Sequence, residues 1–279
     1  MFFASSERMI TRVPIPRWAG IAMCLFGGLF FLLAIDEARW QPPPTSSGVN
    51  FPGYSFSTTA RLIGWDDLRL RRGADETPVE FAARANKAIF SAVYHCRDIS
   101  GSTWASQRLG ALGLFGFAEH GVLSPKYLQC GFCSQVSYVL SRTLRENGID
   151  AFVYGLNGHV VTVFSEGDSQ FIADPDYGIG PWEVNISSSV SMSRLASANY
   201  AWLADRFEQR MVGQYKAVTD AYGNIEDDVQ YMSPEFMDRL ADKQTKVLDA
   251  VSVVIPAFPV IALILFALGL VSITRKHHR

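Results

Sequence analysis

A cysteine, a histidine and an aspartate follow one another within residues 129–177, in the order that a thiol acyl-transfer enzyme needs. Val136, Leu140 and Leu144 repeat at helical spacing. Cys133 directly precedes this run, so we expect it in the first turn of a helix. There the unpaired backbone N–H groups and the helix dipole favour a negative charge, and with it the reactive thiolate.

His159 and Asp174 lie on two apolar, alternating runs joined by the polar turn 165–168, a pattern that predicts a β-hairpin. If the centre of the hairpin is the bond that follows Glu166, His159 lies directly opposite Asp174. Directly opposed residues share a face, with Cβ atoms roughly 5 Å apart. We therefore expect the imidazole and the carboxylate to hydrogen-bond, as a base and the group that orients it.

The segment from about Lys126 to Gly178 resembles the catalytic core of the transglutaminase-like superfamily, within the papain-like cysteine enzymes. Four short motifs carry this resemblance, and they stand in the family's order over about a fifth of the chain. They are a Gly-x-Cys that opens the core helix, a Gly-Ile pair that ends it, a Gly-His that begins a strand and an Asp-Pro that closes the next. Here they read Gly131-Phe132-Cys133, Gly148-Ile149, Gly158-His159 and Asp174-Pro175.

The resemblance implies an α+β fold in which the helix carrying Cys133 packs on an antiparallel sheet. It implies Cys133 as the nucleophile, His159 as general base and acid, and Asp174 as the group that orients the imidazole. The thiolate would attack an amide or ester carbonyl and form a thioester acyl-enzyme, without a metal or an organic cofactor. The family includes crosslinkers, peptidases, amidases and inactive members, so a peptide, a protein or a cell-envelope polymer all remain open as substrate.

Four further residues are candidates for the site. Gln129 lies four residues before the nucleophile and is a candidate side-chain donor to the oxyanion hole, beside the backbone N–H of Cys133. Trp104, Tyr177 and Trp182 are candidate walls of the substrate pocket.

The pair Cys130 and Cys133 also forms a C-x-x-C at a helix start, which is typical of thiol–disulfide oxidoreductases. That fold places its motif after a buried strand, whereas residues 124–129 do not have a strand pattern. A papain-like module that binds peptide or glycan without catalysis is a further alternative. If a disulfide forms, we expect Cys130 to pair with Cys96, because a nucleophile must stay free.

A zinc site is the remaining alternative, because Cys130 and Cys133 could combine with other cysteine and histidine side chains. The available ligands are His95, Cys96, His120 and His159. The adjacent His95 and Cys96 give poor geometry for one ion, so we expect no metal.

Two apolar segments without charges, residues 19–35 and 250–274, are each long enough to span a bilayer, which takes roughly 17–25 residues. Trp18 and Trp40 flank the first segment, as interfacial residues do. A cleaved signal peptide is the alternative there. The leader is long, and no small-x-small pattern precedes Asp36, which favours a retained anchor.

Charges flanking the two segments predict their orientation. Acidic residues dominate the inner sides and basic residues the terminal sides, where Arg8, Arg12, Arg17, Arg275, Lys276 and Arg279 lie. Since basic flanks stay in the cytoplasm, we expect both termini there, and the intervening domain in the periplasm or outside the cell. The net charge of −2 gives no indication of nucleic-acid binding.

These observations divide the chain into six regions. They are a cytosolic tail (1–17), a transmembrane helix (18–36), a Pro-rich linker (37–50), an extracytoplasmic domain (51–248, with its catalytic core at 126–182), a second transmembrane helix (249–274) and a basic cytosolic tail (275–279). Gly20, Cys24 and Gly28 recur every four residues, and this spacing would let the first helix contact the second, a second copy or a membrane partner closely.

Local patterns predict the elements around the catalytic core. A capping box at Thr77 and Glu80 opens a helix that we expect to reach about His95. The expected elements that follow are an irregular stretch 100–126 with one short helix, a helix at 132–147, strands near 150–155, 159–164 and 169–174, a loop at 176–182, a helix at 191–217 and a helix from Ser233 into the second membrane segment.

Overall fold

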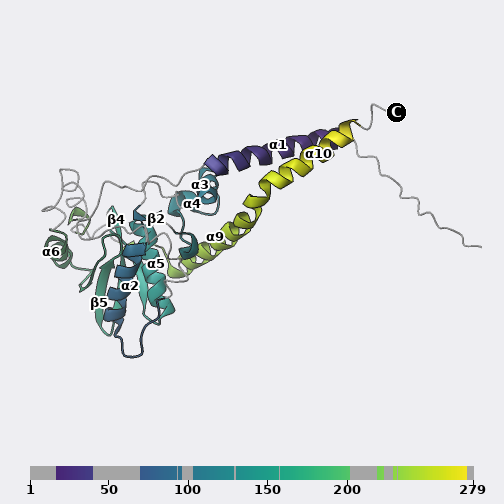
Figure 1. Cartoon of the computed structure of the whole chain (residues 1–279). Coiled ribbons are helices and arrows are strands. Elements are labelled where there is room, and N and C mark those ends of the chain that lie inside the picture. The colour runs from purple at the N-terminus through teal and green to yellow at the C-terminus, as the bar shows by residue number, and fades with distance from the viewer. Residues whose placement is uncertain are drawn as a thin grey trace, which may run out of the picture. The chain divides into compact units, whose positions relative to one another are not determined.

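The computed structural model describes residues 17–39, 70–92, 94–95, 103–128, 130–156, 158–201, 219–222, 229–230 and 232–274 (Figure 1). The chain divides into two compact units. One comprises residues 41–249, and the other comprises residues 1–40 together with residues 250–279. Residues 37–39 of the expected Pro-rich linker belong to the first helix, and the rest of the linker lies outside the described residues.

The larger unit combines helices with short strands. Its helices are α2 (Pro78–Ala92), α3 (Trp104–Ala111), α4 (Phe117–His120), the 3₁₀ turn η2 (Pro125–Tyr127), α5 (Cys133–Glu146), α6 (Ser189–Asn199) and α9 (Pro234–Val254). Its strands are β1 (Tyr94–His95), β2 (Cys130–Gly131), β3 (Ala151–Leu156), β4 (His159–Glu166), β5 (Ser169–Asp174), β6 (Ile179–Glu183) and β7 (Val229–Gln230).

The main sheet is antiparallel throughout, with the strand order β6-β5-β4-β3-β7. Helix α5 packs on β3 and β4, and α2 lies against α5 (Figure 1). Two hydrogen bonds tie α5 to the sheet: Ser137 Oγ donates to Val160 O at 3.0 Å, and Thr162 Oγ1 donates to Ser137 O at 2.9 Å. The expected mixture of helices and an antiparallel sheet is therefore present.

The alternating residues of the sheet that point away from α5 form a hydrophobic core with α6 and the helical residues 219–222. Its buried members are Phe90, Tyr154, Leu156, Val161, Val163, Ile172, Val184, Met192, Leu195, Ala196, Tyr200, Ala221 and Tyr222. This core includes the hydroxyl groups of several tyrosines, which need hydrogen-bond partners when they are buried.

The start of α2 agrees with the sequence, but its end does not. Thr77 N donates to Glu80 Oε2 at 2.9 Å and Glu80 N to Thr77 Oγ1 at 3.2 Å, so the predicted capping box is present. The expected extension to His95 is wrong, because α2 ends at Ala92. Tyr94 and His95 instead pair in parallel with β2, which satisfies their backbone groups outside the helix.

Other expected boundaries also need correction. The stretch 100–126 contains both α3 and α4, not one short helix. Residues 179–182, expected as part of a loop, belong to strand β6 at the edge of the sheet. A proline such as Pro181 is tolerated there, because one side of an edge strand has no neighbouring strand to bond. Helix α6 starts at Ser189 and ends at Asn199, well before the expected end at residue 217, and residues 202–217 lie outside the described part.

The smaller unit contains the two apolar segments. These are helix α1 (Arg17–Arg39), and the 3₁₀ turn η4 (Ile255–Ala257) followed by α10 (Phe258–Thr274). Helix α1, and the continuous run that begins with α9 of the larger unit and continues through η4 and α10, are each long and apolar enough to cross a membrane. The α-helical hydrogen bonding changes to 3₁₀ where Pro256 removes a backbone donor.

Small residues of α1 face α10 in the same chain. A Cβ added to Gly20 would lie 3.2 Å from Gly269 O, and one added to Gly269 would collide with the Cys24 thiol. A Cβ added to Gly27 would lie 3.0 Å from Ala262 O, whereas one added to Gly28 would make only an ordinary contact with Phe266. This close approach relies on glycine at these positions, as in other small-residue helix contacts.

Candidate active site

Cys133 is the first residue of α5, as the sequence predicts. The residue before it, Phe132, has an extended backbone, and its N–H donates to Gln135 Oε1 at 3.0 Å. This bond is one half of a capping box and fixes the helix start. The Cys133 side chain is partly exposed and is not in a disulfide, so a thiol sits at the positive end of the helix dipole.

The hairpin that carries His159 and Asp174 has a different register from the expected one. Glu166 pairs with Ser169, so the position across from His159 is two residues beyond Asp174. The prediction that they lie directly opposite each other is therefore wrong. Side chains alternate between the two faces of a strand, so a shift of two residues keeps both on one face, as diagonal neighbours.

His159 Nε2 and Asp174 Oδ2 are 2.7 Å apart, and both side chains are buried. Asp174 Oδ1 accepts a hydrogen bond from the backbone N–H of Asp176 at 3.0 Å, and Asp174 Oδ2 accepts one from Tyr200 Oη. Contacts to both oxygens fix the plane of the carboxylate, and this plane in turn orients the imidazole. Because Nε2 is hydrogen-bonded to Asp174, Nδ1 is the ring nitrogen that can form a hydrogen bond with the thiol.

Burial by itself lowers the pKa of His159, because it penalises the charged imidazolium. The negative charge of Asp174 and hydrogen bonds to Asp174 and Cys133 act in the opposite direction. They raise the pKa of His159 well above its ordinary value. The structure thus brings the thiol, the imidazole and the carboxylate together, with the imidazole between the other two.

Two tyrosines that sequence reasoning missed complete the buried side of the site. Tyr200, the residue that caps the C-terminus of α6, donates to Asp174, and its Oη lies 2.8 Å from Tyr222 Oη. The Tyr222 ring lies 6.5 Å from the His159 ring. Burial and the charge of Asp174 raise the pKa of Tyr200, so it stays a neutral donor. No local pattern marks either residue, because their role depends on a tertiary contact.

Tyr177 and Trp182, two of the predicted pocket residues, join the aromatic cluster at this site. The Tyr177 ring lies 5.7 Å from the His159 ring, and the Trp182 ring lies 6.3 Å from the Tyr200 ring. Burial, followed by the charge of nearby acidic residues, raises the pKa of Tyr177, which keeps this phenol neutral. Trp104 is buried as the first residue of α3.

Some predicted residues fall outside the described part of the chain. Gln129 and Cys96 are among them, and Cys130 is described only by its backbone in β2. The candidate oxyanion donor and the expected pairing of Cys130 with Cys96 therefore stay predictions.

Comparisons with protein-family models, with curated proteins and with solved structures find no match for this chain. What the site can do therefore follows from its own geometry. A thiol at a helix start, beside an imidazole that a buried carboxylate orients, is an arrangement suited to nucleophilic acyl transfer.

Proposed function

We propose that this protein is a membrane-anchored thiol enzyme with a transglutaminase-like, papain-like core. It forms a thioester acyl-enzyme on Cys133 and acts on an amide or ester in a peptide, a protein or a cell-envelope polymer. The observation that carries the proposal is the position of His159 between the Cys133 thiol and the buried Asp174 carboxylate.

The chemistry divides among the three side chains. His159 Nδ1 takes the thiol proton, and the Cys133 thiolate attacks the substrate carbonyl carbon. The backbone N–H of Cys133 faces the developing oxyanion, and one such donor is worth on the order of 3–4 kcal/mol. The imidazolium then protonates the leaving amine or alcohol as the carbon–nitrogen or carbon–oxygen bond breaks. Asp174 holds the ring in place throughout and stays ionised.

The second half of the reaction decides the class of enzyme. Attack of water on the thioester, with His159 now as the base, releases an acid and makes the protein a peptidase or amidase. Attack of an amine gives a new amide and makes it a crosslinker. Both outcomes regenerate the Cys133 thiol.

Acyl-enzyme trapping tests the proposal. The full chain in detergent should form a covalent adduct on Cys133 with an activated ester such as p-nitrophenyl acetate, as seen by mass spectrometry of the intact protein. Cys133→Ala should abolish the adduct with the fold retained, whereas Cys130→Ala should keep a substantial fraction. Loss of the adduct in Cys130→Ala alone would overturn the assignment of the nucleophile. A disulfide between Cys130 and Cys133 in non-reducing peptide maps would favour a redox function instead.

We also propose that the protein crosses the inner membrane twice, with both termini in the cytoplasm and the domain with Cys133 in the periplasm. The two long apolar helices support this, together with the basic residues on their terminal sides. A phosphatase reporter that works only outside the cytoplasm should be active when fused near Asn50 and silent after Arg279. Activity after Arg279 would overturn this topology.

A further inference from the structure

The segment from Gly121 to Ser124, which leads toward the nucleophile, is buried although it has neither helical nor strand structure. Buried backbone N–H and C=O groups need hydrogen-bond partners, and a segment without a ladder must obtain them from side chains. Two glutamines supply them, one from each side of the segment.

Gln244 of α9 forms hydrogen bonds with the backbone of this segment. Its Oε1 accepts from Leu123 N at 2.7 Å, and its Nε2 donates to Gly121 O at 2.9 Å and to Phe115 O at 3.2 Å. The side chain is 0% exposed. A buried glutamine with three such bonds is expensive to replace, because each lost partner leaves a buried polar group unsatisfied.

Gln135 of α5 also forms a hydrogen bond with the backbone of this segment. Its Nε2 donates to Val122 O at 2.9 Å, while its Oε1 accepts from Phe132 N at 3.0 Å. One amide therefore joins the buried segment to the residue just before Cys133. Gly131 belongs to the same contact, since a Cβ there would lie 3.2 Å from Gln135 Cβ.

Together these bonds form a continuous path from α9 to the nucleophile. It runs from Gln244 through Leu123 and Val122 to Gln135, and ends at the start of α5. We propose that Gln244 and Gln135 are positioning residues that hold Cys133 at the angle it needs to reach His159. This role rests on the proposed function of Cys133, and neither glutamine touches the reacting atoms.

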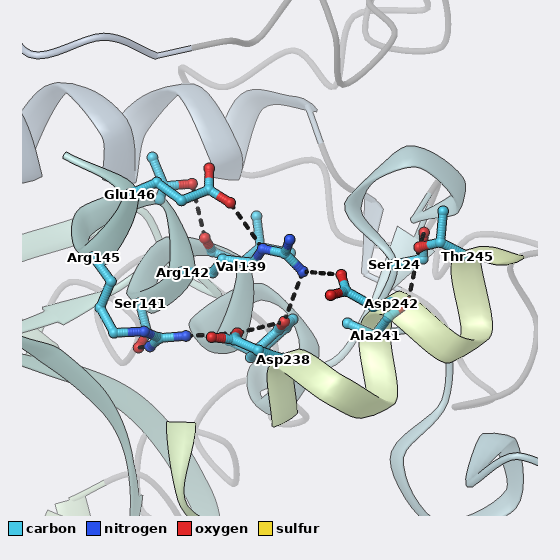
Figure 2. Close-up of polar contacts among 12 residues, drawn as sticks. Ser124, Val139, Ser141, Arg142, Arg145, Glu146, Asp238, Ala241, Asp242 and Thr245 are labelled. Atoms are coloured by element: carbon cyan, nitrogen blue, oxygen red, sulfur yellow. Dashed lines mark hydrogen bonds and ion pairs between the residues drawn. The ribbon is translucent and has the colours of Figure 1, made fainter. Parts of the chain in front are cut away.

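Helix α9 also contacts α5 directly, away from the glutamines, and this contact provides a control. Asp238 Oδ1 accepts from Arg145 Nη2 at 2.7 Å (Figure 2). It also accepts from Tyr138 Oη at 2.9 Å. Arg145 lies in the last turn of α5, far along the helix from Cys133. Asp238→Asn therefore weakens the contact between the two helices without touching the path through the glutamines.

The experiment uses the full chain in detergent. The rate at which iodoacetamide alkylates Cys133, resolved by peptide mass spectrometry, should fall about tenfold in Gln244→Met and in Gln135→Met, equivalent to about 1.4 kcal/mol. The double variant should fall little further, because both residues act through one path. Asp238→Asn should stay within about twofold while its melting temperature falls. A rate within twofold of the parent in Gln244→Met overturns the positioning role.

A second readout separates this role from the proposed function. Hydrogen exchange of the Phe132 amide, which donates to Gln135, should speed up in Gln244→Met but not in Asp238→Asn. This measurement does not require Cys133 to be reactive. If Cys133 of the parent reacts no faster than in the unfolded chain, the proposed function fails. Unchanged Phe132 exchange in Gln244→Met overturns the positioning role even then.

A milder variant covers the case in which Gln244→Met does not fold. Gln244→Glu keeps an acceptor for Leu123 N and, while protonated, one donor in place of the two that reach Gly121 and Phe115. It loses this donor once its carboxyl ionises, so its alkylation rate should be closest to that of the parent at low pH and fall further behind as pH rises. A constant ratio across the pH range would contradict the proposal.

Discussion

The two ends of α5 are held in different ways. The neutral side-chain amide of Gln135 fixes the first turn of α5, where Cys133 lies. The second half of α5 is instead tied to α9 by ion pairs. Figure 2 shows this second half, where Arg142 reaches Asp242 and Arg145 reaches Asp238. Basic residues near a helix C-terminus also complement the helix dipole.

The difference indicates a division of labour within one helix. Neutral hydrogen bonds fix a position without adding a charge beside the thiol, so His159 and the helix dipole set the electrostatics there. Ion pairs at the far end fix the helix in the fold, where extra charge has little effect on the thiol. Changes near Cys133 should therefore alter reactivity, and changes at the far end should alter stability alone.

The largest effect is expected at the carboxylate. Asp174→Asn keeps the shape but lets the wrong imidazole tautomer form, and acylation of Cys133 by p-nitrophenyl acetate should slow on the order of 10³-fold. Asp168→Asn, the same change at the exposed hairpin turn, is the matched control and should have no effect. Equal acylation rates in the two variants would show that Asp174 has no role in the reaction.

A smaller effect is expected from the tyrosine behind the carboxylate. Tyr200→Phe removes one donor to Asp174 without removing the ring, so acylation should slow about tenfold, equivalent to about 1.4 kcal/mol. Tyr222→Phe removes the contact with Tyr200, one step further from the carboxylate, and should change the rate less. Stopped-flow acylation rates decide this, and a larger loss in Tyr222→Phe would reverse the order of the two tyrosines.

The pH dependence of stability tests the protonation state of His159, the partner of the thiol at the start of α5. The pKa of His159 is raised in the folded state from an ordinary value of about 6.5. Its contribution is therefore fully present below about pH 6.5 and is lost as pH rises through the folded pKa. The parent should melt at a higher temperature than His159→Gln, and this difference should shrink as the pH rises above about 6.5. A difference that grows with pH would show that the His159 ring is neutral in the folded protein.

The smallest effect is expected at the far end of α5. Asp242→Asn weakens an exposed contact to Arg142, and such pairs contribute about 0.2–1 kcal/mol. The melting temperature should fall by no more than about 4 °C, and the acylation rate of Cys133 should not change. A drop in the acylation rate would show that the ion pairs also position the thiol and that the two ends are not independent.

The sequence predicted the parts of the site that depend on local rules. The helix start at Cys133, the capping box at Thr77 and the shared face of His159 and Asp174 all follow from periodicity and turn chemistry. The hairpin register was wrong by two residues, because the polar run 165–168 does not show which residues form the turn. An error of two preserved the face, whereas an error of one would have separated the pair.

The missed features depend on contacts between distant segments. Tyr200 and Tyr222 have no signal in their own neighbourhood. Strand β6 was missed because glycine and proline in it are typical of a loop. The charges of α5 and α9 do not by themselves predict their contact. Arg142 and Arg145 of α5 could pair with Asp238 and Asp242 of α9, but Arg239 and Lys243 of α9 have the same spacing and the opposite charge.

The outer strands of the sheet have a consequence for crowding on a membrane. In the described part of the chain these are β6, which contains Pro181, and β7, which is two residues long. Domains tethered to one bilayer would share an orientation and meet often, so long open strand edges would add to one another and aggregate. A proline without an N–H on one edge and a very short strand on the other both oppose such growth.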